Sequence, residues 1–404
     1  ASACFAVPAD PRPFVVTQPD GSTLTVRMIG DEFFHCMMTE DGYLVKRSSD
    51  GVYYFLDNEG DAMDVRACDA SRRTDAVKQR LATLNPENTF NELKASTLAT
   101  SKMWNLQKSM RAPIYRANGD EFDNSDGHDI RVFPTEGEQN VLVICVNFSD
   151  VKFSFDADPH TAMVNMMNQV GYSDYGASGS AYDFYYASSA GKFLPKFDIY
   201  GPVALSKTYS YYGADKGSQI DIRAADRNGD GFVDNVYVFY AGYGQADTGM
   251  EETIWPHAFQ LQYALGAPLT VDGVKVDKYA TSNELNRDDS FDGIGTFCHE
   301  FAHVLGLPDL YETTYSTGAF TPGEYSAMDS GPYNGDGYVP PTFSSYERYA
   351  LEWLNPVLVD QPMTVNMAPL TRANIAYKVN ASESNPMEYF LLENRQREIW
   401  DTYI

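Results

Sequence analysis

Residues 299 to 309 read His299-Glu300-Phe301-Ala302-His303-Val304-Leu305-Gly306-Leu307-Pro308-Asp309, and they predict a metal-binding helix. Residues four positions apart lie on the same face of an α-helix, so the imidazoles of His299 and His303 can bind one metal ion. Glu300 lies between them and projects close to a water molecule on that ion. Two histidines at this spacing also arise by chance in helices, so a metal site needs support from the residues that follow.

The extension beyond the second histidine predicts a third metal ligand. Gly306 can adopt the left-handed conformation that ends a helix, and Pro308 prevents the helix from continuing. The chain then turns back and brings Asp309 towards the metal, with Glu312 as the reserve candidate for this role. Three protein ligands leave a fourth position open for water, as a catalytic zinc ion requires.

A second segment agrees with this interpretation. Tyr325-Ser326-Ala327-Met328-Asp329-Ser330-Gly331 places Met328 in a short turn-forming stretch, where metzincins have the Met-turn beneath the zinc. A methionine in a loop more often only fills a gap in the core. Its distance after the histidine helix favours the Met-turn.

These segments resemble the immune-inhibitor-A family of secreted bacterial zinc metallopeptidases. The similarity covers about residues 140 to 356. It includes Phe297-Cys298 before the first histidine, Leu310-Tyr311 after Asp309, and the segments Ala241-Gly242-Tyr243-Gly244, Ile254-Trp255-Pro256-His257 and Ser345-Tyr346-Glu347-Arg348. The resemblance implies an α/β (α+β) metzincin-like zinc peptidase domain with a mixed sheet and an active-site helix.

The N-terminal region resembles the prosegment of such enzymes, in Gly30-Asp31-Glu32-Phe33-Phe34-His35 and Thr39-Glu40-Asp41-Gly42-Tyr43. The resemblance implies a secreted, extracellular or cell-surface-associated bacterial proenzyme that its own prosegment inhibits. Cys36 or its neighbour His35 is a candidate for blocking the zinc in the latent state. Family catalytic domains usually run on past the segment matching Glu393-Asn394-Arg395-Gln396, whereas this chain stops soon after it, so the sequence is either the intact protein or a version with its C-terminal part removed.

The predicted function is a zinc-dependent endopeptidase that acts on proteins or peptides, with Glu300 as the general base. One alternative is a non-catalytic surface or adhesin protein with a structural zinc, and another is a narrow-specificity metal-dependent amidase or peptidase. A structural zinc site usually closes with a fourth protein ligand, often cysteine. Cys298 is the nearby cysteine and lies on the wrong face of the helix, so the enzyme is favoured.

Composition excludes several classes of partner. The chain has 404 residues, 43% of them hydrophobic, which is enough for two or three domains with full cores. Its 56 acidic and 30 basic side chains give a net charge of −26, which disfavours binding to nucleic acid or anionic membranes. No apolar run approaches the roughly twenty residues of a transmembrane segment. The five cysteines are odd in number and do not make a disulfide framework, so most are expected to be buried thiols.

Turn signals and hydrophobic periodicity divide the chain into four parts. Residues 1–110 are predicted to form the prosegment, a small antiparallel β-rich domain and then helix, because Asp-Gly and Glu-Gly pairs separate short alternating runs. Residues 111–138 lack apolar periodicity and are predicted to be a linker with candidate activation-cleavage sites. Strands and helices alternate through the catalytic domain, residues 139–356. Residues 357–404 are predicted to be a β-rich C-terminal segment.

A second cation site is predicted between residues 226 and 234. Side-chain oxygens at loop positions 1, 3, 5 and 9, Gly231 at position 6 and the carbonyl of Phe232 at position 7 follow the ligand order of a calcium loop. Tyr237 replaces the closing glutamate of an EF-hand, so a calcium loop of another type is predicted. The alternative is an ordinary turn satisfied by water. The side-chain ligands are Asp226, Asn228, Asp230 and Asp234.

Four further features keep two interpretations each. Tyr325 or Tyr346 can supply a phenol to the developing oxyanion, but each is more often simple packing. His257 is more often a hydrogen-bonded core histidine than a ligand. The segment Tyr279–Glu284 is either an edge strand to which an extended peptide adds or a strand with no such role.

Overall fold

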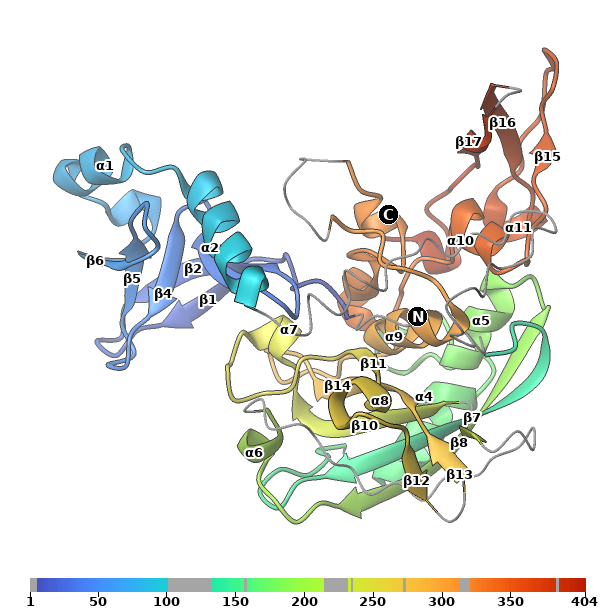
Figure 1. Ribbon diagram of the computed structural model, residues 1–404, viewed down its shortest axis with the longest axis horizontal. Helices are drawn as coiled ribbons and strands as arrows, with labels where there is room; N and C mark the ends of the chain where they lie inside the picture. Colours follow the sequence, from blue (N-terminus) through green and yellow to red (C-terminus); the bar gives the residue numbers. More distant parts are fainter. Residues whose placement is uncertain are drawn as a thin grey trace.

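The computed structural model describes residues 6–100, 133–155, 158–213, 232–233, 235–271, 274–312, 320–382 and 385–404. Figure 1 shows an N-terminal unit (blue) on one side, a larger central unit around α9 (Gly295–Leu305), and a C-terminal sheet (red) above it. The predicted calcium loop lies outside the described residues except for Phe232 and Val233. Most of the predicted linker also lies outside them. Among the described helices, none is long and apolar enough to cross a membrane.

The N-terminal unit is a six-stranded antiparallel sheet whose strands pair in sequence order. The predicted Asp-Gly and Glu-Gly turns join neighbouring strands, and Gly21, Gly42, Gly51 and Gly60 all have positive φ there. Helices α1 (Asp75–Leu81) and α2 (Pro86–Thr100) follow, and Phe90 of α2 packs against Leu44 and Leu56 of the sheet. The strands are β1 (Phe14–Thr17), β2 (Thr23–Gly30), β3 (His35–Thr39), β4 (Leu44–Arg47), β5 (Tyr53–Leu56) and β6 (Ala62–Arg66).

The central unit is built on a five-stranded mixed sheet of order β11-β14-β10-β7-β8. Its four longer strands are parallel, and the short edge strand β11 is antiparallel. The mixed sheet predicted from the sequence is therefore present. The segment Tyr279–Glu284 is internal only at its start, because β14 pairs with β10 along its length but with β11 at residues 278 to 280 alone. The strands are β7 (Gly137–Asn147), β8 (Phe193–Ala204), β10 (Val236–Tyr243), β11 (Ala258–Gln260) and β14 (Lys278–Leu285).

Two layers cover the faces of this sheet. Alternate residues of β7, such as Val141 and Val143, share the main core with α4 (Pro159–Asn168), α5 (Ala181–Ser188) and α9. The opposite face packs with the short helices and a three-stranded sheet of order β12-β13-β9. These elements are α6 (Tyr209–Gly213), α8 (Leu261–Leu265), β9 (Phe232–Val233), β12 (Leu269–Val271) and β13 (Val274–Val276), whereas α7 (Gln245–Thr248) packs through Ala246 with Ala6, Val7 and Trp255.

The C-terminal residues form a small sheet and then return to the central core. In Figure 1 the strands β16 and β17 stand away from the central unit. After them, Trp400 packs edge-on against Phe184 of α5, and Asp401 accepts a hydrogen bond from the backbone of Thr342 at 3.0 Å. The last residues therefore help to close the core over α5. The C-terminal elements are α10 (Ser345–Ala350), β15 (Val357–Leu358), α11 (Leu370–Ala373), β16 (Tyr377–Ser382), β17 (Asn385–Leu392) and the short turn η5 (Ile399–Asp401). Three further short turns come earlier in the chain: η2 (Asp174–Gly176), η3 (Gly323–Tyr325) and η4 (Gly331–Gly337).

Candidate active site

Helix α9 carries both histidines and is buried along its whole length. Phe297 and Phe301 anchor it to the sheet through aromatic contacts with Tyr237 and Phe197. The helix ends at Leu305 because the next residue, a glycine, takes a left-handed conformation with φ of 105°. The backbone N–H of Leu307 then bonds back to the carbonyl of Ala302 at 3.0 Å, and the chain reverses as the sequence predicts.

The reversal brings Asp309 to the two histidines. Oδ1 of Asp309 lies 3.1 Å from Nε2 of His299 and 3.2 Å from Nε2 of His303. The two Nε2 atoms are 3.0 Å apart. The reserve candidate, Glu312, is not part of this cluster of metal-ligating groups among the described residues. The three predicted ligands thus present one atom each to a common point.

Backbone carbonyls fix which nitrogen of each imidazole faces that point. Nδ1 of His299 lies 2.8 Å from the carbonyl oxygen of Ala327, and Nδ1 of His303 lies 2.8 Å from that of Leu307. A carbonyl only accepts, so each Nδ1 carries the hydrogen and each Nε2 keeps a lone pair for a ligand. Burial also lowers the pKa of His303, which favours the neutral imidazole that binds metals.

The donor set fits a zinc ion. Zinc takes nitrogen and carboxylate oxygen at about 2.0–2.2 Å in tetrahedral geometry, which places neighbouring ligand atoms roughly 3.3 Å apart. The three observed separations are close to this value. Oδ1 of Asp309 and Oε2 of Glu300 are also buried without a hydrogen-bond partner among the described residues. Carboxylate oxygens buried in this way need a cation or a proton to offset their charge.

The electrostatics of Glu300 are dominated by burial. Burial raises the pKa of its carboxyl group well above the usual range, and the nearby charge of Asp309 raises it further. One contact acts in the opposite direction: the backbone N–H of Val7 donates to Oε1 of Glu300 at 2.8 Å. The candidate general base is therefore in contact with the N-terminal segment of its own chain.

Residues 6 to 10 cover the candidate site, and the first three of them each make a hydrogen bond with a residue of the central unit. The hydroxyl of Tyr311 donates to the carbonyl of Ala6 at 3.0 Å, and Nε1 of Trp255 donates to the carbonyl of Val7 at 3.0 Å. The hydroxyl of Tyr333 donates to the carbonyl of Pro8 at 2.6 Å. None of these three donors was singled out as functional from the sequence, because the contacts join residues about 250 or more positions apart.

A carboxylate of the N-terminal unit also reaches this region. Both carboxylate oxygens of Glu32 are buried and lack a hydrogen-bond partner among the described residues. Burial raises the pKa of Glu32 well above its usual range, and the charges of Asp31, Asp309 and Glu300 add to the effect. Three carboxylates that repel one another are thus buried around the histidines, which strengthens the case for a cation there.

The predicted Met-turn packs beneath the histidines. Met328 is fully buried, and its neighbour Ala327 supplies the carbonyl that orients His299. A buried carboxylate holds this turn: Oε1 of Glu347 accepts from the hydroxyl of Ser326 at 2.7 Å and from the backbone N–H of Met328 at 3.3 Å. Glu347 also closes the N-terminal capping box of α10. It is a positioning residue that the sequence analysis did not identify.

Other candidates lie away from the cluster. His257 is a hydrogen-bonded core histidine, because its two ring nitrogens contact the carbonyl of Trp255 and the hydroxyl of Tyr279. Tyr325 is half exposed. Cys36 does not join the metal-ligating cluster, and burial raises its pKa to about 12, which disfavours the thiolate that zinc binds. His35 instead stacks against Trp255.

Comparison with known proteins finds one family and two relatives that this chain resembles. Residues 215–355 match the catalytic domain of immune inhibitor A peptidase M6, and this range contains all three candidate ligands and Glu300. The pre-pro-metalloprotease PrtV of Vibrio cholerae serotype O1 is 26% identical over 302 residues, which cover 56% of this chain and 32% of PrtV. Immune inhibitor A of Bacillus thuringiensis subsp. alesti is 28% identical over 148 residues, 32% of this chain and 21% of that protein. The chain thus spans about a third or less of the length of these relatives.

Proposed function

We propose that this chain, which belongs to the immune inhibitor A family of M6 peptidases, is a secreted zinc-dependent endopeptidase held in a latent proenzyme form. One observation carries the proposal: Nε2 of His299, Nε2 of His303 and Oδ1 of Asp309 converge within 3.2 Å of one another, on the helix that also carries Glu300. Such a set of three ligands with a neighbouring glutamate is typical of hydrolytic zinc sites.

The residues divide the chemistry between them. When held by the three ligands, zinc supplies a Lewis acid that polarises a peptide carbonyl and makes a water molecule acidic near neutral pH. Glu300 accepts a proton from water while the water oxygen forms a bond to the carbonyl carbon. The bond between that carbon and the peptide nitrogen then breaks, and Glu300 gives the proton to the departing amine. The carboxylate is regenerated, and the peptide has consumed one water.

The contacts of residues 6 to 10 support inhibition by the prosegment. Val7 contacts the general base, and Ala6, Val7 and Pro8 are held by Tyr311, Trp255 and Tyr333. A peptide substrate cannot reach Glu300 while this segment is in place. The relative PrtV is named a pre-pro-metalloprotease, which supports a precursor form. Cleavage and release of residues 1 to about 110 is therefore the proposed activation step.

A purely structural zinc is less consistent with the site. A structural zinc is normally closed by a fourth protein ligand. Among the described residues, the metal-ligating cluster contains three groups, and Cys298 is not one of them. Cys298 is instead fully buried in the core beside Phe297.

A calcium site at residues 226 to 234 remains part of the proposal and rests on the order of oxygen ligands in the sequence alone. Calcium there would stabilise the chain just before β10, a central strand of the catalytic sheet. We expect removal of calcium, with zinc retained, to lower the Tm. An unchanged Tm would show that no such site exists.

Zinc analysis combined with a hydrolysis assay tests the proposed function. The purified chain is assayed on casein before and after limited trypsin treatment, with zinc measured in the same samples. We expect bound zinc in both samples and hydrolysis that appears or increases strongly after proteolysis. A zinc-loaded, folded protein that never cleaves casein or a peptide library would contradict the proposal.

A further inference from the structure

The peptide bond between Ala6 and Val7 is held from both sides by groups of the candidate active site. The N–H of this peptide unit donates to Oε1 of Glu300 at 2.8 Å. Its carbonyl accepts from the hydroxyl of Tyr311 at 3.0 Å. The proposed general base must give a proton to the nitrogen of the bond that it cuts. The unit between Ala6 and Val7 therefore lies in the orientation in which a bond would be cut, with its nitrogen at Glu300.

The next two carbonyls of the segment are bound by side chains from separate parts of the catalytic unit. Trp255, which precedes β11, donates to the carbonyl of Val7, and Tyr333, in η4, donates to the carbonyl of Pro8. In an extended chain successive carbonyls point to opposite sides. Donors from separate parts of the catalytic unit on consecutive carbonyls are the arrangement that an extended peptide requires.

This recognition does not depend on polar side chains of the segment. The side chains of Ala6 and Val7 pack in a small apolar cluster with Trp255 and Ala246, and the directional contacts all go to backbone atoms. Burial keeps the pKa of Tyr333 well above its usual range, so its phenol remains a hydrogen-bond donor. Backbone groups are common to every peptide, so these donors suit a substrate of unrelated sequence equally well.

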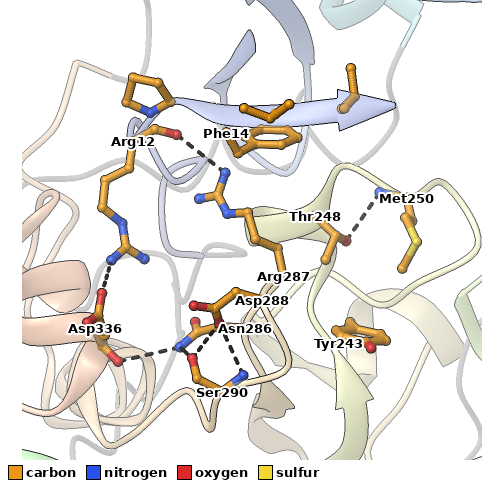
Figure 2. Close-up of a pocket in the computed structure, with 13 residues that line it drawn as sticks. Arg12, Phe14, Tyr243, Thr248, Met250, Asn286, Arg287, Asp288, Ser290 and Asp336 are labelled. Atoms are coloured by element: carbon orange, nitrogen blue, oxygen red, sulfur yellow. Dashed lines mark hydrogen bonds and ion pairs between the residues drawn. The ribbon is translucent and has the colours of Figure 1, made fainter. Parts of the chain in front are cut away.

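After Pro8, the prosegment is bound through its own side chains. Asp10 is fully buried and forms ion pairs with Arg12 and Arg287. A cavity of about 670 Å³ lies beside this part of the segment. In Figure 2, Arg12 reaches Asp336 on one side of the cavity, and Arg287 lies beneath the ring of Phe14. The pairs of Asp10 with Arg287 and of Arg12 with Asp336 retain the prosegment, whereas the three donors to residues 6 to 8 recognise only its backbone.

We propose that Tyr311, Trp255 and Tyr333 bind the backbone of the substrate, with the Tyr311 hydroxyl donating to the carbonyl oxygen of the bond that is cut. This inference rests on the proposed peptidase function. Tyr311 stabilises negative charge on that oxygen by a hydrogen bond, without transferring its proton. Trp255 and Tyr333 hold the two following carbonyls on the leaving-group side. The substrate class is an extended peptide chosen mainly by its backbone.

Three single substitutions separate these roles. Tyr311→Phe, Tyr333→Phe and Trp255→Phe are made in the full chain, activated by limited proteolysis, and assayed on a casein-derived peptide. We expect Tyr311→Phe to lower kcat by roughly 100-fold or more with little change in KM, as for loss of an oxyanion donor. We expect Tyr333→Phe and Trp255→Phe to raise KM by roughly 5- to 10-fold, as for loss of one hydrogen bond.

Two control variants separate these roles from general effects on folding and activation. Tyr186→Phe removes the phenol of a half-exposed tyrosine on α5 and should change neither constant. Arg12→Gln weakens retention of the prosegment, so the uncleaved chain should gain activity, while the activated enzyme keeps wild-type constants. Zinc content and Tm are measured for every variant. Tyr311→Phe with wild-type kcat and KM would overturn the assignment of Tyr311.

A binding measurement decides the inference independently of turnover. Proteins carrying Glu300→Gln are activated, and binding of a fluorescent octapeptide rich in alanine and leucine is followed by anisotropy. Trp255→Phe and Tyr333→Phe should each weaken binding by roughly 5-fold or more. Unchanged binding would overturn the inference even if the enzyme hydrolyses casein. If the activated wild-type protein hydrolyses no peptide while these substitutions still weaken binding, the peptidase function is wrong and the peptide site is right.

Discussion

The backbone N–H of Val7 donates to Oε1 of Glu300 at 2.8 Å, although 293 positions separate the two residues in the chain. The contact joins the N-terminal segment to the group that the proposed mechanism needs for proton transfer. It explains how one chain can contain a complete set of candidate catalytic groups and still exclude a substrate from them.

Glu300→Gln tests the general base. The amide keeps the size of the side chain and can still contact Val7, but it cannot accept a proton from water. We expect zinc content and Tm to stay close to wild type. The rate of hydrolysis by the activated enzyme should fall by about 100- to 10,000-fold. Substantial peptidase activity in this variant would remove Glu300 from the mechanism.

Asp309→Asn tests the third ligand against the reserve candidate. The substitution removes the charge from the oxygen that lies 3.1 Å and 3.2 Å from the histidine nitrogens. We expect zinc affinity, measured by competition with a chelator, to fall by about 100-fold or more, because even changes behind the ligands cost 10- to 100-fold. Glu312→Gln is the matched control and should retain wild-type affinity. If Glu312→Gln lowers zinc affinity more than Asp309→Asn does, Glu312 is the third ligand.

Glu347→Ala tests the support beneath the histidines. The substitution leaves the hydroxyl of Ser326 and the backbone N–H of Met328 without their buried acceptor. We expect a loss of about 2–4 kcal/mol in unfolding free energy and weaker zinc binding, because Ala327 in the same turn orients His299. Glu347→Gln keeps an acceptor and should lose less. Wild-type zinc affinity in Glu347→Ala would mean that the turn does not position the histidine.

Asp292 gives a pH dependence to stability. Burial raises its pKa to about 7, well above the 3.8 of an exposed aspartate, and the hydrogen bond with Thr296 and the charge of Arg12 only partly offset this. Between about pH 4 and pH 7 the folded state keeps a proton that the unfolded state has released. The stability that this group contributes is therefore fully present below about pH 4. It falls by up to about 1.4 kcal/mol per pH unit as the pH rises, and it is lost by about pH 7.

Asp292→Asn should reduce this dependence. The amide retains an acceptor but does not titrate, so the fall in Tm between pH 5 and pH 8 should be smaller than in wild type. The other buried carboxyl groups are unchanged in the comparison. Parallel Tm profiles for the two proteins would show that Asp292 is not protonated in the folded state near neutral pH.

Lys94→Ala tests the buried ion pair of the N-terminal unit. Nζ of Lys94 lies 2.9 Å from Oδ2 of Asp31, and both side chains are almost fully buried. Removing one partner leaves an uncompensated charge next to Glu32, which should cost about 3–5 kcal/mol. The uncleaved protein should then gain activity, because the carbonyl of Gly30, at the end of β2 and next to Asp31, accepts the backbone N–H of Ala9. The exposed pair Lys78–Asp75 offers a control: Lys78→Ala should cost less than about 1 kcal/mol.

The metal cluster could be predicted because its information is local. His299, His303 and Asp309 lie within eleven residues, and helix periodicity with one left-handed glycine is enough to bring them together. The match over residues 215–355 supports the family that these residues predict. The mixed sheet was also predictable, since its strands are continuous apolar runs such as β10.

The surroundings of the cluster could not be predicted from local patterns. The contacts of Val7, Trp255 and Tyr333 depend on how distant units pack. Strand β3 was not predicted because its sequence, HCMMT, has no alternation and most of its residues are half-buried. The segment 275–280 has the sequence pattern of one strand, but the structure divides it at Asp277 between β13 and β14. The carboxylate of Asp277 accepts a hydrogen bond from the backbone N–H of Gln262 at the break between the two strands.

The zinc content of the purified full-length chain tests the central claim most directly. Elemental analysis should find one zinc per wild-type chain, or uptake of one zinc after exposure to the ion, and close to none in a protein carrying His299→Ala and His303→Ala. Contents that are equal in the two proteins, or a folded wild-type chain that neither contains nor accepts zinc, would contradict the account.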